Sequence, residues 1–167
     1  YYPAECLFGT IGFEDIWPWQ ADYDFNDVLL DYNVKATIND DGMVSKIDMV
    51  LYLRASGAGY QNGFGISFKH SWCWENEPMA DIASVSVNGV TVEPEETDYP
   101  SYILIENISE YQPSYNTFMD QGFAYPTRFE VEIVMNTPAW DWWEVELPLN
   151  NPFIIVRRAC GGSGGLN

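Results

Sequence analysis

The chain has 167 residues, of which 47% are hydrophobic and 19% charged, a balance typical of one globular domain with a real core. Its 25 acidic and 7 basic side chains give a formal charge of −18, so we expect it to repel nucleic acid and anionic membranes. No apolar run approaches the roughly 20 residues that a helix needs to span a bilayer, which argues against membrane insertion.

An acidic segment near the amino terminus is the first distinctive feature. Residues 22–27 contain four side chains with oxygen ligands, and an acidic pair lies upstream at residues 14–15. Because Ca²⁺ typically binds about six to eight oxygen atoms, from carboxylates, amides, carbonyls and water, this segment predicts a calcium site. The candidate ligands are Glu14, Asp15, Asp22, Asp24, Asn26 and Asp27. An Asx-rich turn that holds no metal is the alternative interpretation.

The acidic segment lacks the pattern of an EF-hand. That loop needs Gly at its sixth position and Glu at its twelfth. Asp27 and Asn33 occupy these positions when counting starts at Asp22. A structural metal is therefore favoured over a signalling one.

Alternation of side chains along an extended chain makes two further predictions about this region. Tyr23 and Phe25 should point away from the acids and anchor the loop in the core. Only one of Glu14 and Asp15 should face the ion.

The chain from residue 28 onward shows the signals of strands and tight turns. Residues 28–38 and 44–54 flank a turn cluster and predict a hairpin, with apolar residues at period two in the second strand. Asn88 and Gly89 supply the positive φ angles of a type I′ turn, which predicts a second hairpin within residues 84–92. Further strands are expected at residues 64–69, 102–105, 128–135 and 153–156.

These elements predict an all-β fold. No segment has a sustained helical period, so we expect an antiparallel β-sandwich, jelly-roll or Ig-like, with few or no helices. Residues 1–158 would form one domain, followed by a flexible Gly-rich tail at residues 159–167. The four glycines between residues 57 and 65 lack the spacing of a phosphate loop and predict a turn or bulge.

Aromatic and histidine residues bear on the class of function. Two tryptophan clusters could form a sugar-binding platform or an interface, although packing in a core is also common for such residues. His70 is the single histidine, and nothing near it resembles a hydrolytic triad, so we expect no enzymatic activity. The platform residues are Trp72, Trp74, Trp140, Trp142 and Trp143.

Three cysteines leave the disulfide pattern open. Cys6, Cys73 and Cys160 form no CxxC pair, which disfavours a thiolate metal site. In an extracellular protein, a disulfide between Cys6 and Cys160 would tie the two ends of the chain together. Three unpaired thiols are the alternative.

Four sequence blocks occur in the order found in the LruC-domain family. They are FEDIWP at residues 13–18, DYDFND and DYN within residues 22–33, RASGAGYQNGFGI at residues 54–66, and NPFII at residues 151–155. The chain resembles this family over residues 13 to 155. The resemblance implies a β-rich domain of bacterial envelope or secreted proteins, with a calcium site and no established enzymatic activity.

The resemblance also implies roles for individual residues. Asp22, Asp24 and Asp27 would be ligands, Asn26 would add an oxygen or form the turn, and Glu14 or Asp15 would complete the shell. With Tyr1 as its first residue, the chain is expected to be the mature form of an extracellular or cell-surface protein. The family's usual segment after the NPFII block, with its His-Leu-Pro type motif, is missing, which would leave a sheet edge open to strand addition.

Three functions from different classes follow from these observations. The first is a non-enzymatic, calcium-binding structural or adhesive domain of the bacterial cell surface. The second is a self-assembling subunit of an extracellular filament or surface polymer, built by strand addition between copies. The third is a carbohydrate-binding module whose tryptophan clusters contact a glycan.

Overall fold

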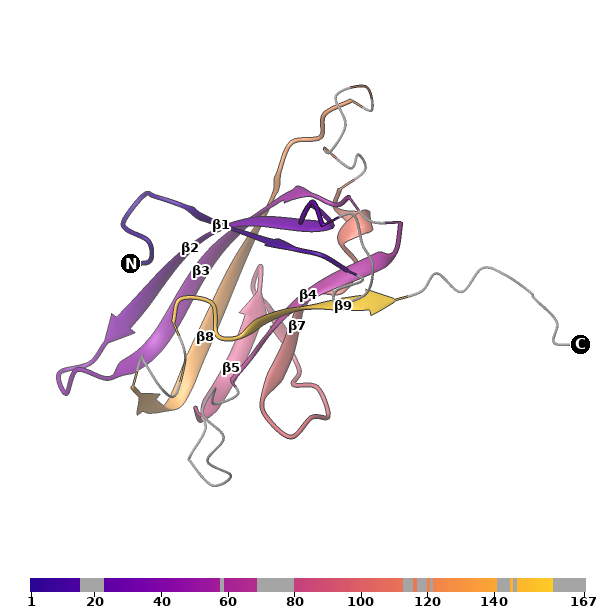
Figure 1. The fold of residues 1–167 in the computed structure, drawn as a ribbon. Helices are drawn as coiled ribbons and strands as arrows, with labels where there is room; N and C mark the ends of the chain where they lie inside the picture. The colour runs from indigo at the N-terminus through magenta and orange to yellow at the C-terminus, as the bar shows by residue number, and fades with distance from the viewer. Residues whose placement is uncertain are drawn as a thin grey trace, which may run out of the picture.

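The computed structural model describes residues 1–15, 23–57, 59–68, 80–112, 116, 120, 122–140, 145 and 147–157. Nine strands and one short 3₁₀ turn, Ile108–Glu110, form the regular structure of these residues. The strands make two antiparallel sheets that pack together around one hydrophobic core (Figure 1). The predicted all-β sandwich with few or no helices is therefore confirmed.

The larger sheet has six strands in the order β1-β2-β3-β8-β5-β6. The hairpin of β2 and β3 pairs through β3 with the long strand β8, and β3 and β8 are the two central strands. The bounds are β1 Gly9–Phe13, β2 Val28–Ile38, β3 Val44–Ala55, β5 Ile82–Val87, β6 Val90–Val92 and β8 Thr127–Ala139. The hairpin predicted for residues 28–54 is confirmed, and β1 pairs with β2 at the edge of the sheet.

The smaller sheet has three strands in the order β7-β4-β9. They are β4 Gln61–Ser67, β7 Ser101–Ile105 and β9 Pro152–Arg157, close to the segments that the sequence predicted. Between Phe64 and Gly65 the register of β4 against β7 shifts, so the glycine-rich segment does contain an irregularity of the predicted kind. In Figure 1 this sheet lies across the larger one, with β9 leading to the carboxyl terminus.

The core follows the period-two pattern of the strands. Alternate residues of β3 are buried, and three of them face buried apolar partners in the middle of β8. Apolar cross-strand pairs of this kind are the main stabilising contacts of a half-buried sheet. The pairs are Ile47 with Ile133, Met49 with Val131, and Leu51 with Phe129.

The turn between β5 and β6 has the predicted type I′ geometry. Asn88 and Gly89 have φ angles of 51° and 78°, and the backbone N–H of Asn88 donates to the carbonyl oxygen of Glu130 at 2.7 Å. The Asn88 side chain accepts a hydrogen bond from the Glu130 backbone N–H at 2.9 Å, which ties the turn to β8.

Replacing Gly89 with alanine is expected to lower the free energy of unfolding by about 1–2 kcal/mol, the cost of a left-handed conformation for a residue with Cβ. The added Cβ would meet no atom within 4 Å, so the change isolates backbone strain from steric overlap. Urea unfolding of the two proteins measures the difference. Gly42→Ala repeats the test in the turn between β2 and β3, since Gly42 has a φ of 80° and equally open surroundings. We expect a similar loss of stability in this variant. Unchanged stability in both variants would contradict the strain argument.

The part of the chain that the structure describes contains no helix with the length and apolar character of a membrane span.

Candidate metal site

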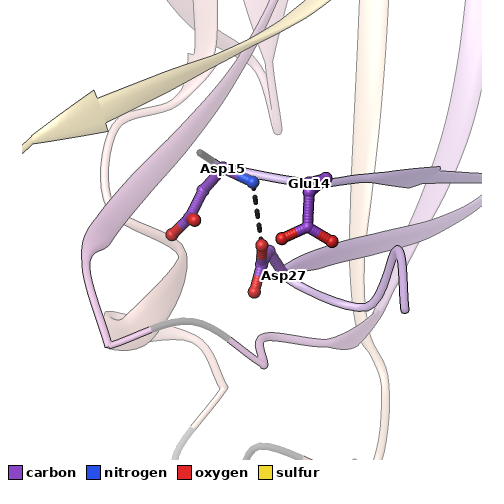
Figure 2. Close-up of side chains that lie close together, drawn as sticks. All are labelled: Glu14, Asp15 and Asp27. Atoms are coloured by element: carbon purple, nitrogen blue, oxygen red, sulfur yellow. Dashed lines mark hydrogen bonds between the residues drawn. The ribbon is translucent and has the colours of Figure 1, made fainter. Parts of the chain in front are cut away.

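Three carboxylates converge at one end of the β1–β2 pair. One oxygen atom from each of Glu14, Asp15 and Asp27 lies within 4.8 Å of the corresponding atoms of the other two. Glu14 and Asp27 are 8% and 7% exposed, and Asp15 is half-buried. Figure 2 shows that Glu14 and Asp15 extend from one segment of the chain and that Asp27 points toward them from another.

The register of two strands brings these residues together. In the antiparallel pair of β1 and β2, Phe13 lies opposite Val28. Glu14 directly follows Phe13 and Asp27 directly precedes Val28, so the continuation of the register sets these two carboxylates against each other. The pairing of β1 with β2 thus fixes the position of both acids.

Hydrogen bonds orient the carboxylates. The backbone N–H of Asp15 donates to Asp27 Oδ2 at 2.8 Å, the bond drawn in Figure 2. The backbone N–H of Phe25 donates to Glu14 Oε2 at 3.3 Å. Because backbone donors hold one oxygen of Asp27 and one of Glu14, the main chain orients two of the three carboxylates.

Two glycines allow the loop before β2 to lie close to its neighbours. A Cβ on Gly57 would lie 1.7 Å from Asn26 Oδ1, and the Gly57 N–H donates to the Asn26 carbonyl oxygen at 2.9 Å. A Cβ on Gly12 would lie 2.5 Å from the carbonyl oxygen of Phe25. Close packing at these two points holds the loop in place beside the acids.

The size of the cluster suits a calcium ion. Ca²⁺ binds oxygen at about 2.3–2.6 Å, so two ligands on opposite sides of one ion are about 5 Å apart. The separations within the cluster do not exceed 4.8 Å. Three carboxylates supply hard oxygen donors of the kind this ion prefers, with room for further ligands from neutral groups or water.

The other predicted ligands do not belong to the cluster of three carboxylates or lie outside the described residues. Asp24 is exposed and does not belong to the cluster; its Oδ2 accepts a hydrogen bond from Asn26 Nδ2. Asn26 instead links the loop to Gly57 through its backbone, which fits the role of turn-former. Asp22 lies outside the described residues.

The predicted burial of Tyr23 and Phe25 is wrong. These side chains are 47% and 48% exposed. Their φ angles are 57° and 52°, in the left-handed region, so the loop is not extended and the alternation of a strand does not apply to it. Both aromatic side chains therefore lie at the surface and not in the core.

The prediction that only one of Glu14 and Asp15 faces the site is also wrong. Strand β1 ends at Phe13, so the pleat does not govern the two residues that follow it. Both side chains reach the cluster with Asp27.

One polar residue at the site was not predicted from the sequence. Asn62, in β4 of the smaller sheet, is 2% exposed, and its Nδ2 donates to Asp15 Oδ2 at 3.3 Å. It lies 47 positions from Asp15 in the chain, and a lone asparagine in a glycine-rich strand carries no signal of metal binding.

The tryptophan and cysteine predictions fall largely outside the described residues. Trp140 is 41% exposed, whereas Trp72, Trp74, Trp142 and Trp143 are not described, so the glycan platform stays a prediction. Cys6 is exposed and has a free thiol. Cys73 and Cys160 lie outside the described residues. Cys160 is the predicted disulfide partner of Cys6.

Basic side chains on the larger sheet pair with acids outside the cluster. Lys46 Nζ lies 2.9 Å from Asp48 Oδ1 and 2.6 Å from Glu132 Oε2. Hydrogen bonds to Glu132 and Asp48 raise the pKa of Lys46. Arg54 Nε lies 2.8 Å from Asp31 Oδ2. Since these pairs are exposed to solvent to varying degrees, each contributes little to stability.

Comparison with known proteins identifies one related family. The family model of DUF4842, a domain of unknown function, matches residues 42–163. The match includes the strands from β3 to β9 and begins after the three carboxylates. The comparisons with curated proteins and with solved structures find no match.

Proposed function

The chain belongs to the DUF4842 family, and we propose that it is a calcium-stabilised, non-enzymatic β-sandwich with a structural or adhesive role at the bacterial cell surface. The observation that carries the proposal is the group of three carboxylates within 4.8 Å, two of them buried. The resemblance to the LruC-domain family, with its envelope and secreted members, supports the cellular setting.

The electrostatics of the cluster favour a bound cation. Two carboxylates a few ångströms apart repel each other by on the order of 1–4 kcal/mol, depending on the local dielectric. Burial weakens the solvent screening that would reduce this repulsion. A divalent cation among Glu14, Asp15 and Asp27 turns the repulsion into attraction, in a chain whose formal charge is −18.

The position of the cluster favours a structural role for the ion. Glu14 and Asp27 sit where the β1–β2 pairing ends and the intervening loop begins. An ion at this point closes the base of the loop and fastens β1 to the edge of the larger sheet. A domain whose total free energy of unfolding is about 5–15 kcal/mol would depend measurably on such an ion.

Calorimetric titration of the chelator-treated protein with CaCl₂ tests the proposal, with MgCl₂ as the competing ion. We expect one saturable site per chain and weaker binding of Mg²⁺, which requires near-ideal octahedral geometry and gives up its water reluctantly. Absence of heat or of a saturable curve for Ca²⁺ would overturn the proposal.

A second candidate function is self-assembly by strand addition. Among the described residues, β9 pairs only with β4, which leaves it at an edge of the smaller sheet. Val156 in this strand is 40% exposed. An unprotected edge strand offers backbone donors and acceptors to another chain.

Light scattering of the purified protein over a range of concentrations tests this second function. We expect assemblies larger than a monomer, and smaller ones for Val156→Lys, which adds a charge to the β9 edge. Val90→Lys is the matched control, because Val90 is 70% exposed on β6 at the edge of the other sheet. A strict monomer at every concentration would exclude the polymer.

A further inference from the structure

We infer that Asn62 is a further ligand of the ion, so that the ion joins the two sheets of the sandwich. This inference rests on the proposed calcium site and extends it by a residue and by a mechanical role. The three carboxylates all flank the β1–β2 pair of the larger sheet, whereas Asn62 belongs to β4 of the smaller one.

The amide of Asn62 has an unsatisfied oxygen atom. Asn62 is 2% exposed, and its Oδ1 has no hydrogen-bond partner among the described residues. Buried polar atoms in folded proteins nearly always have a partner, so an exception calls for an explanation. An ion that accepts this oxygen as a ligand supplies the missing partner.

The amide also lies in the right place. Its Nδ2 donates to Asp15 Oδ2 at 3.3 Å, which holds the planar amide group against a carboxylate of the cluster. Because Oδ1 belongs to the same planar group as Nδ2, it cannot lie far from that carboxylate. A neutral amide oxygen is a common calcium ligand, and it adds coordination without adding repulsion to the three acids.

A shared ion would couple the sheets. Glu14, Asp15 and Asp27 are fixed by the larger sheet through β1 and β2, and Asn62 is fixed by the pairing of β4 with β9. One ion that binds both groups acts as a cross-link at this end of the core. Release of the ion would therefore loosen the contact between the sheets as well as the loop.

Terbium luminescence tests the inference, because Tb³⁺ is a hard cation that replaces Ca²⁺ at oxygen sites. Lifetimes in H₂O and D₂O give the number of water molecules on the ion, and titration gives its affinity. In Asn62→Ala we expect about one additional bound water, since a vacated calcium-type position is filled by solvent. We also expect binding at least about tenfold weaker, comparable to other losses around metal sites.

Asn150→Ala is the matched control. Asn150 is 1% exposed, its Oδ1 also lacks a partner among the described residues, and its Nδ2 donates to the carbonyl oxygen of Val145 rather than to an acid. It should retain the affinity and hydration number of the unchanged protein even if its stability falls. Equal affinity and hydration in Asn62→Ala and the unchanged protein would overturn the inference while leaving the calcium site intact. No binding of Tb³⁺ or Ca²⁺ by the unchanged protein would overturn both.

Asn62→Asp keeps the test decisive if Asn62→Ala does not fold. This variant preserves side-chain size and replaces the amide oxygen with a charged one. If Asn62 contacts the ion, the variant should bind Tb³⁺ with an unchanged hydration number, because its carboxylate oxygen replaces the amide oxygen as a ligand. An additional water on Tb³⁺ in this variant would overturn the inference.

Discussion

Replacing Asp27 with asparagine is expected to lower the melting temperature of the calcium-saturated protein and to raise that of the calcium-free protein. Asparagine keeps the size of the side chain and an oxygen that can accept the Asp15 N–H. It removes one negative charge from a group of three carboxylates within 4.8 Å. With calcium bound, an ionic ligand is lost; without calcium, a repulsion on the order of 1–4 kcal/mol per pair is relieved.

These opposite changes in melting temperature distinguish a metal ligand from a residue that acts only through a hydrogen bond. Differential scanning calorimetry of both proteins, with CaCl₂ and after chelation, measures all four melting temperatures. Each kcal/mol corresponds to about 2–4 °C for a chain of this length. A decrease of equal size in both conditions would mean that Asp27 acts only through the hydrogen bond from Asp15.

Two exposed acids serve as controls for the charge itself. The sequence alone predicts that Asp24→Ala imitates calcium removal, while Glu95→Ala has little effect. In the structure both residues are exposed and neither belongs to the cluster, so we now expect small changes from both. A large, calcium-dependent effect of Asp24→Ala would mean that the ion binds further along the loop, at Asp24.

Replacing Phe64 with alanine is expected to lower the free energy of unfolding by about 3–5 kcal/mol, the usual cost of deleting a buried aromatic ring. Phe64 is 1% exposed in β4, and its ring centroid lies 6.0 Å from that of Phe13 in β1. The ring therefore fills the space between the two sheets, close to the residue that precedes Glu14. Urea unfolding monitored by circular dichroism measures the loss.

Val90→Ala is the control for this prediction. Val90 is 70% exposed on β6, so its truncation should change the stability by less than about 0.5 kcal/mol. Similar effects of the two substitutions would contradict the assignment of Phe64 to the core between the sheets.

The strands were predictable because their burial is periodic. In β3, inward residues from Ile47 to Leu53 recur at every second position, and the sequence shows this directly. The Asn88–Gly89 turn was predictable because few residue pairs adopt two consecutive positive φ angles. Both features depend on neighbours in the chain.

The site was predictable only in part, because its geometry depends on contacts between distant segments. The acidic composition indicated residues 14–27, but the selection of Glu14, Asp15 and Asp27 follows from the register of β1 against β2. The left-handed φ angles of Tyr23 and Phe25, which the sequence does not reveal, leave these two rings exposed where an extended chain would have buried them.

The proposed structural role of calcium is tested most directly by thermal unfolding of one protein preparation, with saturating CaCl₂ and after chelation. A ligand at about 1,000 times its dissociation constant stabilises the folded state by about 4 kcal/mol. For a chain of this length, that corresponds to a rise in melting temperature of about 8–16 °C. A rise of this size that returns when calcium is added back to the chelated sample is the predicted result. Superimposable unfolding curves in the two conditions would show that the three carboxylates hold no stabilising ion.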